Sequence, residues 1–600
     1  MKSYATLQLE RTRRWWTLYW RDMVTGAAVG AVLFLLIYGF TPLDPCNDGW
    51  IYNGYIEDDI IQSYAGWQYL RQDAWHLPLC WANNVAAPTG ASMAYTDVYP
   101  LAAVFFKLLG PLLPATFQYF GIVNFLNFCL QGAMGCLLLR LFSEKRSLCA
   151  LGSILFCLAP VFVERVFRHT ALGSQWVILL ALYLYFWARR TGRLPAAAFV
   201  VLCCLVPAVH AYFLPMVFAL LAAALLEDVL RRKKVLKALL CFILCTAGAL
   251  LSAWGFGVLM PQEGAIGGSY GVFTMNLNAL WNPTSFDYLS KQGFMNWSSL
   301  IPISPQLHYN YDGFNYLGAA VLAGAAVLAV FGAVLFIKKA RAGRHPGKKA
   351  GAFLKSHLGL VLACAVMTLF ALSNVISWNA EVLFCYPLPG FVTDVCGIFR
   401  SSGRIFWPVG YLILLAVCTG AMRLPKKYWM QLAALLLLAA VQTADLWPAL
   451  QRKHADFAGG APEEPGYYNS ETLRFFAENY ENVFCLGTFM DYRLSAAFVR
   501  YHPQVQTNLV FFNRGTYSDT EITYIERLRC LLDGGEVEGD TLYLCSDEGT
   551  YNELMSNLDP DARGYRTDGP YYFICIPKEG CPLTGELPET AGAAGDAADA

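Results

Sequence analysis

An acidic and aromatic segment, residues 55–67 (YIEDDIIQSYAGW), carries the side chains most suited to chemistry in this sequence. Read as a helix over 56–70, it places an apolar face (Ile56, Ile60, Tyr64 and Trp67) opposite a polar face (Asp59, Gln62, Ser63 and Gly66). We expect this helix to lie in a membrane interface with Asp59 toward water and Asp58 beside it. A carboxylate at such a boundary is costly to remove from water and contributes little to the fold. It is suited to the deprotonation of an acceptor hydroxyl. The alternative is that both acids are ordinary solvated residues.

A second candidate set is cationic. It comprises Arg165, Arg168 and His169 between two predicted spans, and Arg400 and Arg404 before a later one. Guanidinium groups bind phosphate in bidentate fashion, which makes these arginines candidate phosphate ligands. The i, i+4 spacings 165/169 and 400/404 predict that each pair shares one helical face. The alternative is pairing with neighbouring carboxylates such as Glu164 and Asp394, or with lipid headgroups.

Weaker candidates complete the list. Asp97 adds a carboxylate at the end of the first outer loop, and Asn276 and Asn278 offer amide groups of the kind that bind sugar rings. Gln62 shares the polar face of Asp59 and is a candidate substrate ligand. His210 lies between two apolar runs and is interpreted as a packing residue.

Metal and disulfide signals are few. Neither a CxxC nor an HExxH spacing occurs, so no structural metal site is predicted. A divalent cation (Mg²⁺ or Mn²⁺) could bind through Asp58, Asp59 or Asp97, although nothing in the sequence requires one. Most of the nineteen cysteines are interpreted as free, but the outer-loop pairs Cys46/Cys80 and Cys385/Cys396 could form disulfides.

Composition places these residues in an integral membrane protein. Of 600 residues, 56% are hydrophobic and 15% charged, and the net charge of zero gives no indication of a nucleic-acid partner. Apolar runs predict about eleven α-helical spans, starting near residues 23, 118, 147, 173, 196, 211, 236, 316, 358, 405 and 428. The proline-broken run 98–114 is interpreted as re-entrant or surface-lying.

Charge distribution predicts the topology. Every second loop is basic, which indicates a cytoplasmic N-terminus (1–22) and a transmembrane domain over 23–447. Its large outer loops are 41–97, 261–315 and 377–404. Beyond it we expect an extracytoplasmic α/β domain (448–582), with strands at 482–486 and 571–576 and helices at 470–480 and 520–532, then a disordered tail (583–600).

Several separated segments together resemble one bacterial membrane family, the domain of unknown function 6311 (DUF6311), which is similar to GT-C glycosyltransferases. They are Asp59 with Gln62 and Gly66-Trp67; Tyr95-Thr-Asp97 with Pro100; 117–121 (FQYFG); 168–172 (RHTAL); 275–280 (MNLNAL) with Asn282-Pro283; 313–318 (GFNYLG); and 399–407 (FRSSGRIFW). The resemblance implies a GT-C-like fold, a polyprenyl-phosphate sugar donor and a catalytic carboxylate in the first outer loop. It makes Asp59 the candidate base and gives the arginines a donor phosphate to hold. Where the family is expected to read Gly-Asp-Pro, this chain has Asp58-Asp59-Ile60, so the choice between Asp58 and Asp59 stays open.

We therefore expect a bacterial cytoplasmic-membrane glycosyltransferase, inverting, that moves a hexose or pentose from a polyprenyl phosphate to an extracytoplasmic glycan or envelope acceptor. Two alternatives are a transporter or lipid flippase, and a non-catalytic protein that binds envelope polymer. Transporters place ionisable residues near the bilayer midplane, whereas the acids here cluster at the outer ends of the predicted spans.

Overall fold

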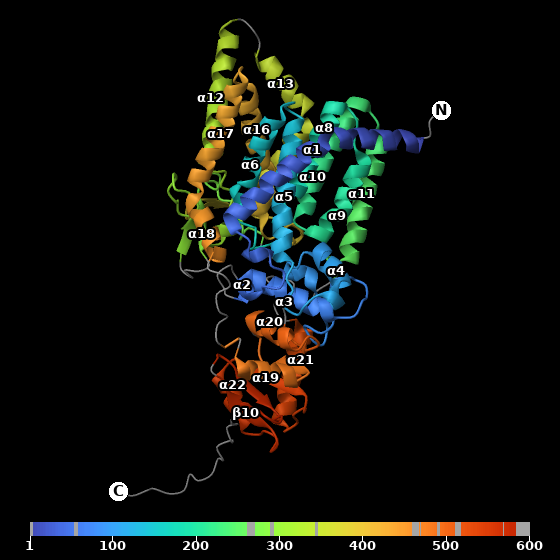
Figure 1. The fold of residues 1–600 in the computed structure, drawn as a ribbon, viewed down its shortest axis with the longest axis vertical. Coiled ribbons are helices and arrows are strands. Elements are labelled where there is room, and N and C mark those ends of the chain that lie inside the picture. The colour runs from blue at the N-terminus through green and yellow to red at the C-terminus, as the bar shows by residue number, and fades with distance from the viewer. Residues whose placement is uncertain are drawn as a thin grey trace.

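The computed structural model describes residues 4–52, 58–260, 270–287, 293–342, 346–458, 467–468, 470–488, 492–509, 518–567 and 569–583. Side chains at a few segment ends, including residues 4–18 and Asp58, lie outside the described part. The described chain is mostly helical, with an elongated helix bundle at one end and a small sheet at the other (Figure 1).

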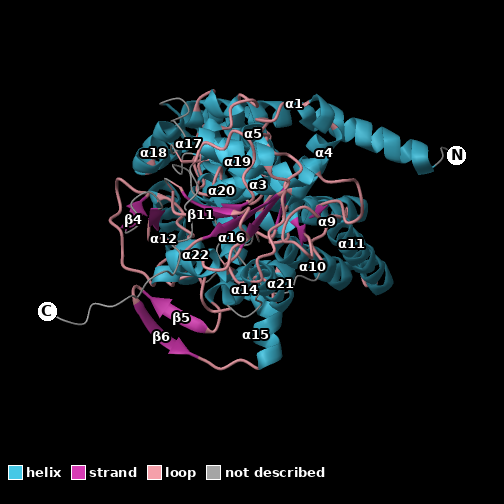
Figure 2. Ribbon diagram, turned by 90° about the horizontal axis from the view of Figure 1, so that it is seen from below, coloured by secondary structure: helices cyan, strands magenta, loops and turns pink. Residues whose placement is uncertain are grey.

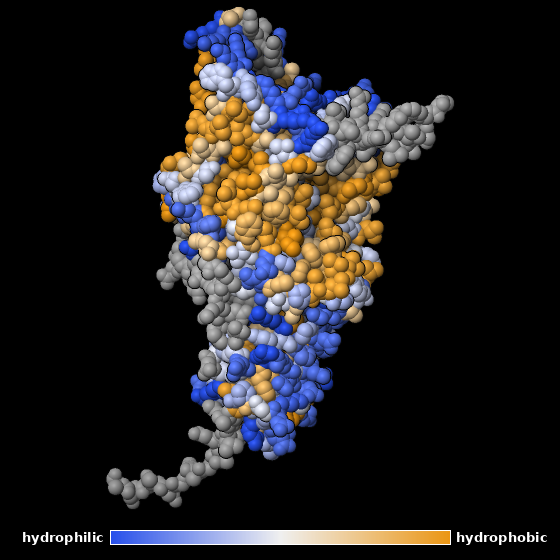
Figure 3. All heavy atoms as spheres, in the orientation of Figure 1, coloured by the Kyte–Doolittle hydropathy of each residue, from blue (hydrophilic) through white to orange (hydrophobic). Residues whose placement is uncertain are grey.

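Long apolar sequences form the bundle. Its helices are α1 (Tyr4–Tyr38), α5 (Phe120–Arg140), α6 (Arg146–Cys157), α8 (Trp176–Thr191), α9 (Ala196–Val209), α10 (Phe213–Arg232), α11 (Val235–Gly255), α12 (Ala319–Arg341), α14 (Leu358–Leu372), α16 (Trp407–Arg423), α17 (Tyr428–Asp445) and α18 (Trp447–Ala458). Helices α1 and α5 approach so closely that a Cβ on Gly132 would lie 2.2 Å from the carbonyl oxygen of Gly26. Small residues permit such contacts between apolar helices. On the face shown in Figure 3, apolar side chains form a belt around the bundle, with polar residues at both ends.

The predicted spans all coincide with helices, but not all these helices are long enough to cross a bilayer. Within the described residues, six helices have the required length and apolar composition, or seven if the bent pair α17 and α18 is one span. Helices α6, α9 and α14 have 12, 14 and 15 residues. At 1.5 Å per residue they reach only about 18–22 Å, less than the ~30 Å hydrocarbon core. The chain is thus a membrane protein by composition, and the expected eleven full spans are not confirmed.

Four helices of the bundle share one polarity. Helices α8, α10, α12 and α16 each end in a basic last turn, with Arg189–Arg190, Arg231–Arg232, Lys338–Lys339 with Arg341, and Arg423. Their first residues lie at the opposite end of the bundle, the end that faces the sheet (Figure 1). The bundle therefore has one basic end and one end that meets the segment between α1 and α5.

That first segment contains α2 (Gly49–Tyr52), α3 (Asp58–Gln72), the strand pair β1 (Trp81–Ala82) and β2 (Ala91–Ser92), and α4 (Pro100–Leu108). The predicted helix is present as α3, but the expectation of a water-facing side is wrong. Gln62 and Ser63, on the predicted polar face, are as buried as Tyr64 on the apolar face. The reason is tertiary: the turn before α4 packs on this face through the hydrogen bond from Ser63 to the Thr96 carbonyl, and α20 (Tyr492–Tyr501) packs across α3 as well. The run 98–114 becomes α4, which exposes the apolar residues Phe105 and Leu108 and matches a surface-lying element.

The C-terminal region contains a five-stranded sheet in the order β10-β11-β9-β7-β8. Its strands are β7 (Asn482–Cys485), β8 (Gln506–Thr507), β9 (Thr541–Cys545), β10 (Arg563–Arg566) and β11 (Tyr572–Cys575). Strand β7 runs parallel to β8 and β9, whereas β11 is antiparallel to β9 and β10. Helices α19 (Glu471–Asn479), α20, α21 (Asp519–Asp533) and α22 (Glu548–Met555) accompany it. The predicted strands are present as β7 and β11, and the predicted helices are present as α19 and α21.

This sheet is joined to the segment between α1 and α5. The Ala86 amide donates to the Leu509 carbonyl at 3.1 Å, and the Thr507 amide donates to Asn84 at 3.1 Å, which extends the β8 edge. Tyr69 of α3 contacts the Ser495 hydroxyl of α20 at 3.1 Å. The C-terminal region therefore holds α3 against the bundle.

The segments that link α11 to α12 and α14 to α16 form short elements. They are the hairpin β3 (Thr284–Asp287) with β4 (Gly293–Asn296), the 3-10 turn η4 (His308–Gly313), the hairpin β5 (Val375–Trp378) with β6 (Glu381–Cys385), α15 (Gly390–Gly397) and the 3-10 turn η5 (Ser402–Phe406). All nineteen cysteines lie in described segments and are free thiols, so neither Cys46/Cys80 nor Cys385/Cys396 is bonded. Figure 2 shows the molecule from the sheet end, with β5, β6 and α15 projecting sideways.

Candidate active site

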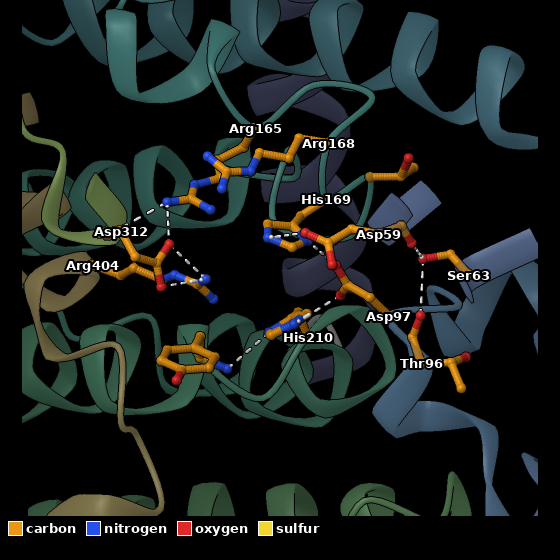
Figure 4. Close-up of polar contacts among 12 residues, drawn as sticks. Asp59, Ser63, Thr96, Asp97, Arg165, Arg168, His169, His210, Asp312 and Arg404 are labelled. Carbon is orange, nitrogen blue, oxygen red and sulfur yellow. Dashed lines mark hydrogen bonds and ion pairs between the residues drawn. The ribbon is translucent and has the colours of Figure 1, made fainter. Parts of the chain in front are cut away.

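A cavity of about 470 Å³ opens at the end of the bundle nearest the sheet. Segments far apart in the sequence line it: α3, the turn before α4, the loop between α6 and α8, the junction of α9 and α10, the end of α11, η4 and the approach to η5. Its polar lining consists of Asp59, Gln62, Tyr95, Asp97, Arg168, His169, His210, Tyr212, Tyr311, Asp312, Arg400, Ser401 and Arg404. Asp59 and Asp97 lie with the two histidines on one side, and Asp312 lies with Arg165 and Arg404 on the other (Figure 4).

The acidic side is a chain of alternating carboxylates and imidazoles. His169 places Nε2 3.5 Å from Asp59 Oδ2 and Nδ1 3.0 Å from Asp97 Oδ2. His210 Nε2 lies 2.9 Å from the other oxygen, Asp97 Oδ1. Asp97 therefore binds two imidazoles, while Asp59 contacts His169 at one end of this series and lines the cavity.

Both ring nitrogens of His169 face carboxylates, and the surroundings of His210 set its protonation state. The Tyr212 amide donates to His210 Nδ1 at 3.1 Å, which leaves the Nε2 proton of a neutral ring for Asp97. Burial lowers the pKa of His210, against the opposing effect of Asp97, and so favours this neutral form. Burial raises the pKa of Asp97, but the attraction and hydrogen bonds of the two histidines outweigh it and hold that pKa well below the ordinary value.

Two bulky residues beside these groups have left-handed backbone. Tyr99 and Phe167 have φ of 54° and 67°, and Asp97 itself has φ of 64°. Each such bulky residue costs about 1–3 kcal/mol and persists only where the surrounding structure enforces it. The constraint is visible at the turn before α4, where the Ser63 hydroxyl donates to the Thr96 carbonyl at 2.9 Å. The fold thus holds Asp97, and Phe167 directly before Arg168, in unfavourable backbone settings beside the cavity.

The cationic side is an ion network. Arg404 Nη2 lies 2.8 Å from both oxygens of Asp312, and Arg165 Nη2 lies 2.6 Å from Asp312 Oδ1. Glu164 binds Arg165 Nε at 2.7 Å and also pairs with Arg168. All five side chains are buried.

This network has a net positive charge. Burial raises the pKa of Glu164 and of Asp312, but the arginines beside each carboxyl hold both pKa values below the ordinary range. Both acids are therefore ionised. Arg165, Arg168 and Arg404 against two carboxylates leave one positive charge in the network, and Arg400 in the cavity lining adds a second, opposite the carboxylates of the acidic side. The cavity consequently separates negative from positive charge across its width.

A polar stripe on α5 holds the loop that carries Arg168 and His169. Asn124 Nδ2 donates to the Thr170 hydroxyl at 3.1 Å, and Asn127 Nδ2 donates to the Thr170 carbonyl at 3.1 Å. Ser174 donates to Asn127 Oδ1 at 2.8 Å. Because these groups are buried, each bond also removes the cost of an unpaired polar atom. The loop is therefore held at Thr170 and at Ser174, on the C-terminal side of Arg168 and His169.

The structure brings together most of the residues singled out in the sequence. Asp59, Gln62, Asp97, Arg168, His169, Arg400 and Arg404 all line the cavity. The side chain of Asp58, the first residue of α3, lies outside the described residues.

Asn276 and Asn278 do not line the cavity. Asn276 Nδ2 donates to the Asn379 carbonyl at 2.8 Å, and Asn278 Nδ2 donates to Asn379 Oδ1 at 2.8 Å. Both amides thereby tie their loop to the turn of the β5–β6 hairpin. Their interpretation as sugar ligands has no support from their position.

The sequence patterns did not identify two residues of the site, and they led to one wrong expectation about geometry. His210 binds Asp97 and is not a mere packing residue, and Asp312 gave no signal except its place in an outer loop. The shared helical face expected for 165/169 is wrong, because the chain between α7 (Pro160–Val163) and α8 forms turns. Arg165 turns to Asp312 and His169 to Asp97. One signal could have identified His210. It is a histidine that follows directly after a predicted apolar helix.

Metal ligation has little support in this arrangement. In the described chain, no three His, Cys, Asp or Glu side chains are grouped as a metal site. Asp97 directs both oxygens to imidazole nitrogens, and Asp59 lines the cavity beside it.

Comparison with protein families accounts for most of the chain. The model of the family described as domain of unknown function DUF6311 matches residues 27–447. The chain belongs to the DUF6311 family. The match covers the bundle from the second half of α1 to the end of α17 and includes every residue of the cavity lining, and it ends before the C-terminal sheet. A search of curated proteins finds no match to this DUF6311 chain.

Proposed function

We propose that this DUF6311 protein is a GT-C-type glycosyltransferase that moves a sugar from a polyprenyl-phosphate donor to an extracytoplasmic acceptor. The observation that carries the proposal is the division of charge in the cavity. A phosphate-linked donor needs cations at its phosphate, and a hydroxyl acceptor needs a base on the opposite side of the sugar. The cavity has both, at the end of an apolar helix bundle that can reach a lipid-borne substrate.

In this mechanism Asp59 accepts the proton of the acceptor hydroxyl while the hydroxyl oxygen attacks the anomeric carbon. The bond from that carbon to the donor phosphate breaks, and its electron pair stays on the phosphate oxygen. Arg168 and Arg400 stabilise the growing negative charge, and the anomeric configuration inverts. His169 orients Asp59 through the 3.5 Å contact. Arg404 has a supporting role, because its guanidinium is bound in bidentate fashion by Asp312.

Membrane orientation follows the charge of the helix ends. Helices α8, α10, α12 and α16 place their basic last turns away from the cavity. The positive-inside rule then puts the cavity and the C-terminal α/β region outside the cytoplasm. The cavity lies at the helix ends and not midway along the spans, which favours surface chemistry over transport.

The test is sugar transfer in membranes from radiolabelled polyprenyl-phosphate hexoses and pentoses. Native protein is compared with Asp59→Asn and Asp58→Asn at equal expression, and with Asp394→Asn as a control, since that acid is exposed on α15. We expect Asp59→Asn to lower transfer by about 10²–10⁴-fold, the usual contribution of a general base. Loss only in Asp58→Asn would assign the base to that residue. Absence of transfer from every donor would count against the enzyme and favour transport or polymer binding.

A further inference from the structure

The connection between α14 and α16 exposes a surface of large apolar side chains. Strand β6 is exposed along its whole length, and Phe384 and Phe391 are 57% and 72% exposed. The surface, named here the hairpin surface, consists of Trp378, Val382, Leu383, Phe384, Tyr386, Phe391, Val395 and Ile398. Contiguous apolar patches of this kind mark protein or membrane contacts.

The hairpin surface is carried by a well-anchored element. Asn276 and Asn278 bind the turn of the hairpin at Asn379. At its other end, the Tyr386 hydroxyl donates to the Ser373 carbonyl at 2.9 Å. The apolar side chains are thus presented in a defined orientation while both ends of the hairpin are held to the bundle.

The length of α14 indicates the depth of this element in a bilayer. Its 15 residues follow the basic end of the bundle and cover about 22 Å of the ~30 Å hydrocarbon core. Helix α14 thus ends roughly 8 Å short of the outer boundary of that core, and the hairpin and α15 continue from there toward the cavity end, up to that boundary. A two-stranded hairpin has unpaired backbone edges, which exclude it from pure hydrocarbon but not from the headgroup boundary. The rings of Trp378 and Tyr386 suit that boundary.

Charge on the element favours apolar insertion over attraction to anionic headgroups. Residues 375–398 contain no lysine or arginine, and Glu381 and Asp394 are their only acids. Both acids are exposed, with Glu381 beside the hairpin turn. In Figure 2 β5, β6 and α15 project sideways from the bundle, in the direction a surrounding bilayer would occupy.

We propose that the β5–β6 hairpin and α15 insert into the headgroup–acyl boundary of the bilayer beside the cavity. Ile398 belongs to the hairpin surface and also lines the cavity, as does the following Phe399. The cavity and the membrane surface therefore share a wall. The proposal rests on exposure and helix length and is independent of the reaction proposed above.

Native cysteines provide the first test. Cys385 on β6 and Cys530 on α21 are both exposed in the structure. The full chain, one copy per lipid nanodisc, is treated with a charged, membrane-impermeant maleimide, and modification of each cysteine is followed by peptide mass spectrometry. Because a thiol reacts as the thiolate, which is disfavoured in lipid, we expect Cys385 to react about tenfold more slowly than Cys530. After denaturation in detergent the two rates should become similar. Equal rates in the nanodisc would overturn the proposal.

A second measurement separates lipid from protein coverage. In nanodiscs with lipids brominated near the glycerol end of the chains, Trp378→Phe should remove part of the quenchable tryptophan emission. Trp297→Phe is the control, because Trp297 is 2% exposed and should not contribute to that quenching. A protected Cys385 with no quenching at Trp378 would mean that protein covers the hairpin surface, and the proposal would be wrong.

Discussion

Removal of the Asp312 carboxylate should destabilise the whole cavity end of the bundle. Asp312 accepts two 2.8 Å contacts from Arg404 and one of 2.6 Å from Arg165. The three side chains are only 9%, 1% and 6% exposed for Arg404, Arg165 and Asp312. In Asp312→Ala both guanidinium groups lose a buried counter-charge that solvent cannot replace.

The size of the effect follows from the remaining partners. Breaking a buried ion pair by removing one member costs about 3–5 kcal/mol, because the other charge stays buried. Arg165 keeps Glu164 at 2.7 Å, so the loss at Arg165 is partial and the loss at Arg404 dominates. We therefore expect about 3 kcal/mol, which is a large fraction of the ~5–15 kcal/mol that stabilises a typical folded domain.

Buried cysteines make the effect measurable. Cys157 and Cys418 are buried in the bundle, and a thiol-reactive fluorogenic dye will report their exposure as the detergent-solubilised chain is heated. The midpoint for Asp312→Ala should fall clearly below that of native protein, while the exposed-acid variant Asp394→Ala should leave it unchanged.

A double variant tests the cause. In Asp312→Asn with Arg404→Gln, both charges are absent, and the midpoint should recover part of the loss seen for Asp312→Asn alone. An unchanged midpoint in Asp312→Ala would refute the assignment of this network as a buried ion pair. Additive losses in the double variant would show that the two side chains do not interact.

Four further outcomes follow from the structure. Stability should fall as pH drops below about 6.5, because the unfolded chain protonates His210 while the folded chain keeps it neutral, and His210→Gln should flatten this fall. The Asp97 carboxylate, whose pKa is lowered, should lose its stabilising contribution only in stronger acid, below its ordinary value of about 3.9. Gly132→Ala should cost about 1–3 kcal/mol, since the added Cβ would lie 2.2 Å from a carbonyl oxygen of α1. Asn276→Ala should lower stability by about 1–3 kcal/mol with no change in KM for the sugar donor, because its amide holds the β5–β6 hairpin.

The following results would contradict these expectations. Thermal midpoints between pH 7 and 5 with the same slope in native protein and His210→Gln would exclude that histidine as the titrating group. Gly410→Ala is the control for Gly132→Ala, since a Cβ there meets its nearest neighbour at 3.7 Å. Equal losses from the two alanines would indicate a helix-wide effect instead of a close contact. A raised KM in Asn276→Ala would restore this amide as a substrate ligand.

Local patterns in the sequence predicted the elements of this chain well. The apolar runs coincide with helices, the helix over 56–70 is present as α3, and the strands at 482–486 and 571–576 are present as β7 and β11. These features depend on the residue types of a short segment, through hydrophobic periodicity and length. The number of complete spans could not be read in this way, because apolar runs such as 146–157 end before they reach the length of a bilayer.

The sequence by itself therefore determined a membrane protein, the positions of its helices and the residue types available for chemistry at their ends. Only the tertiary structure decided how those residues pair. It brought His210 and His169, forty-one positions apart, to the same carboxylate, Asp97. It also placed Asp312 between two arginines and turned Asn276 away from the cavity. The physical reason is that ion pairs and amide contacts depend on distances of about 3 Å between separate segments, and only the packing of the whole chain sets those distances.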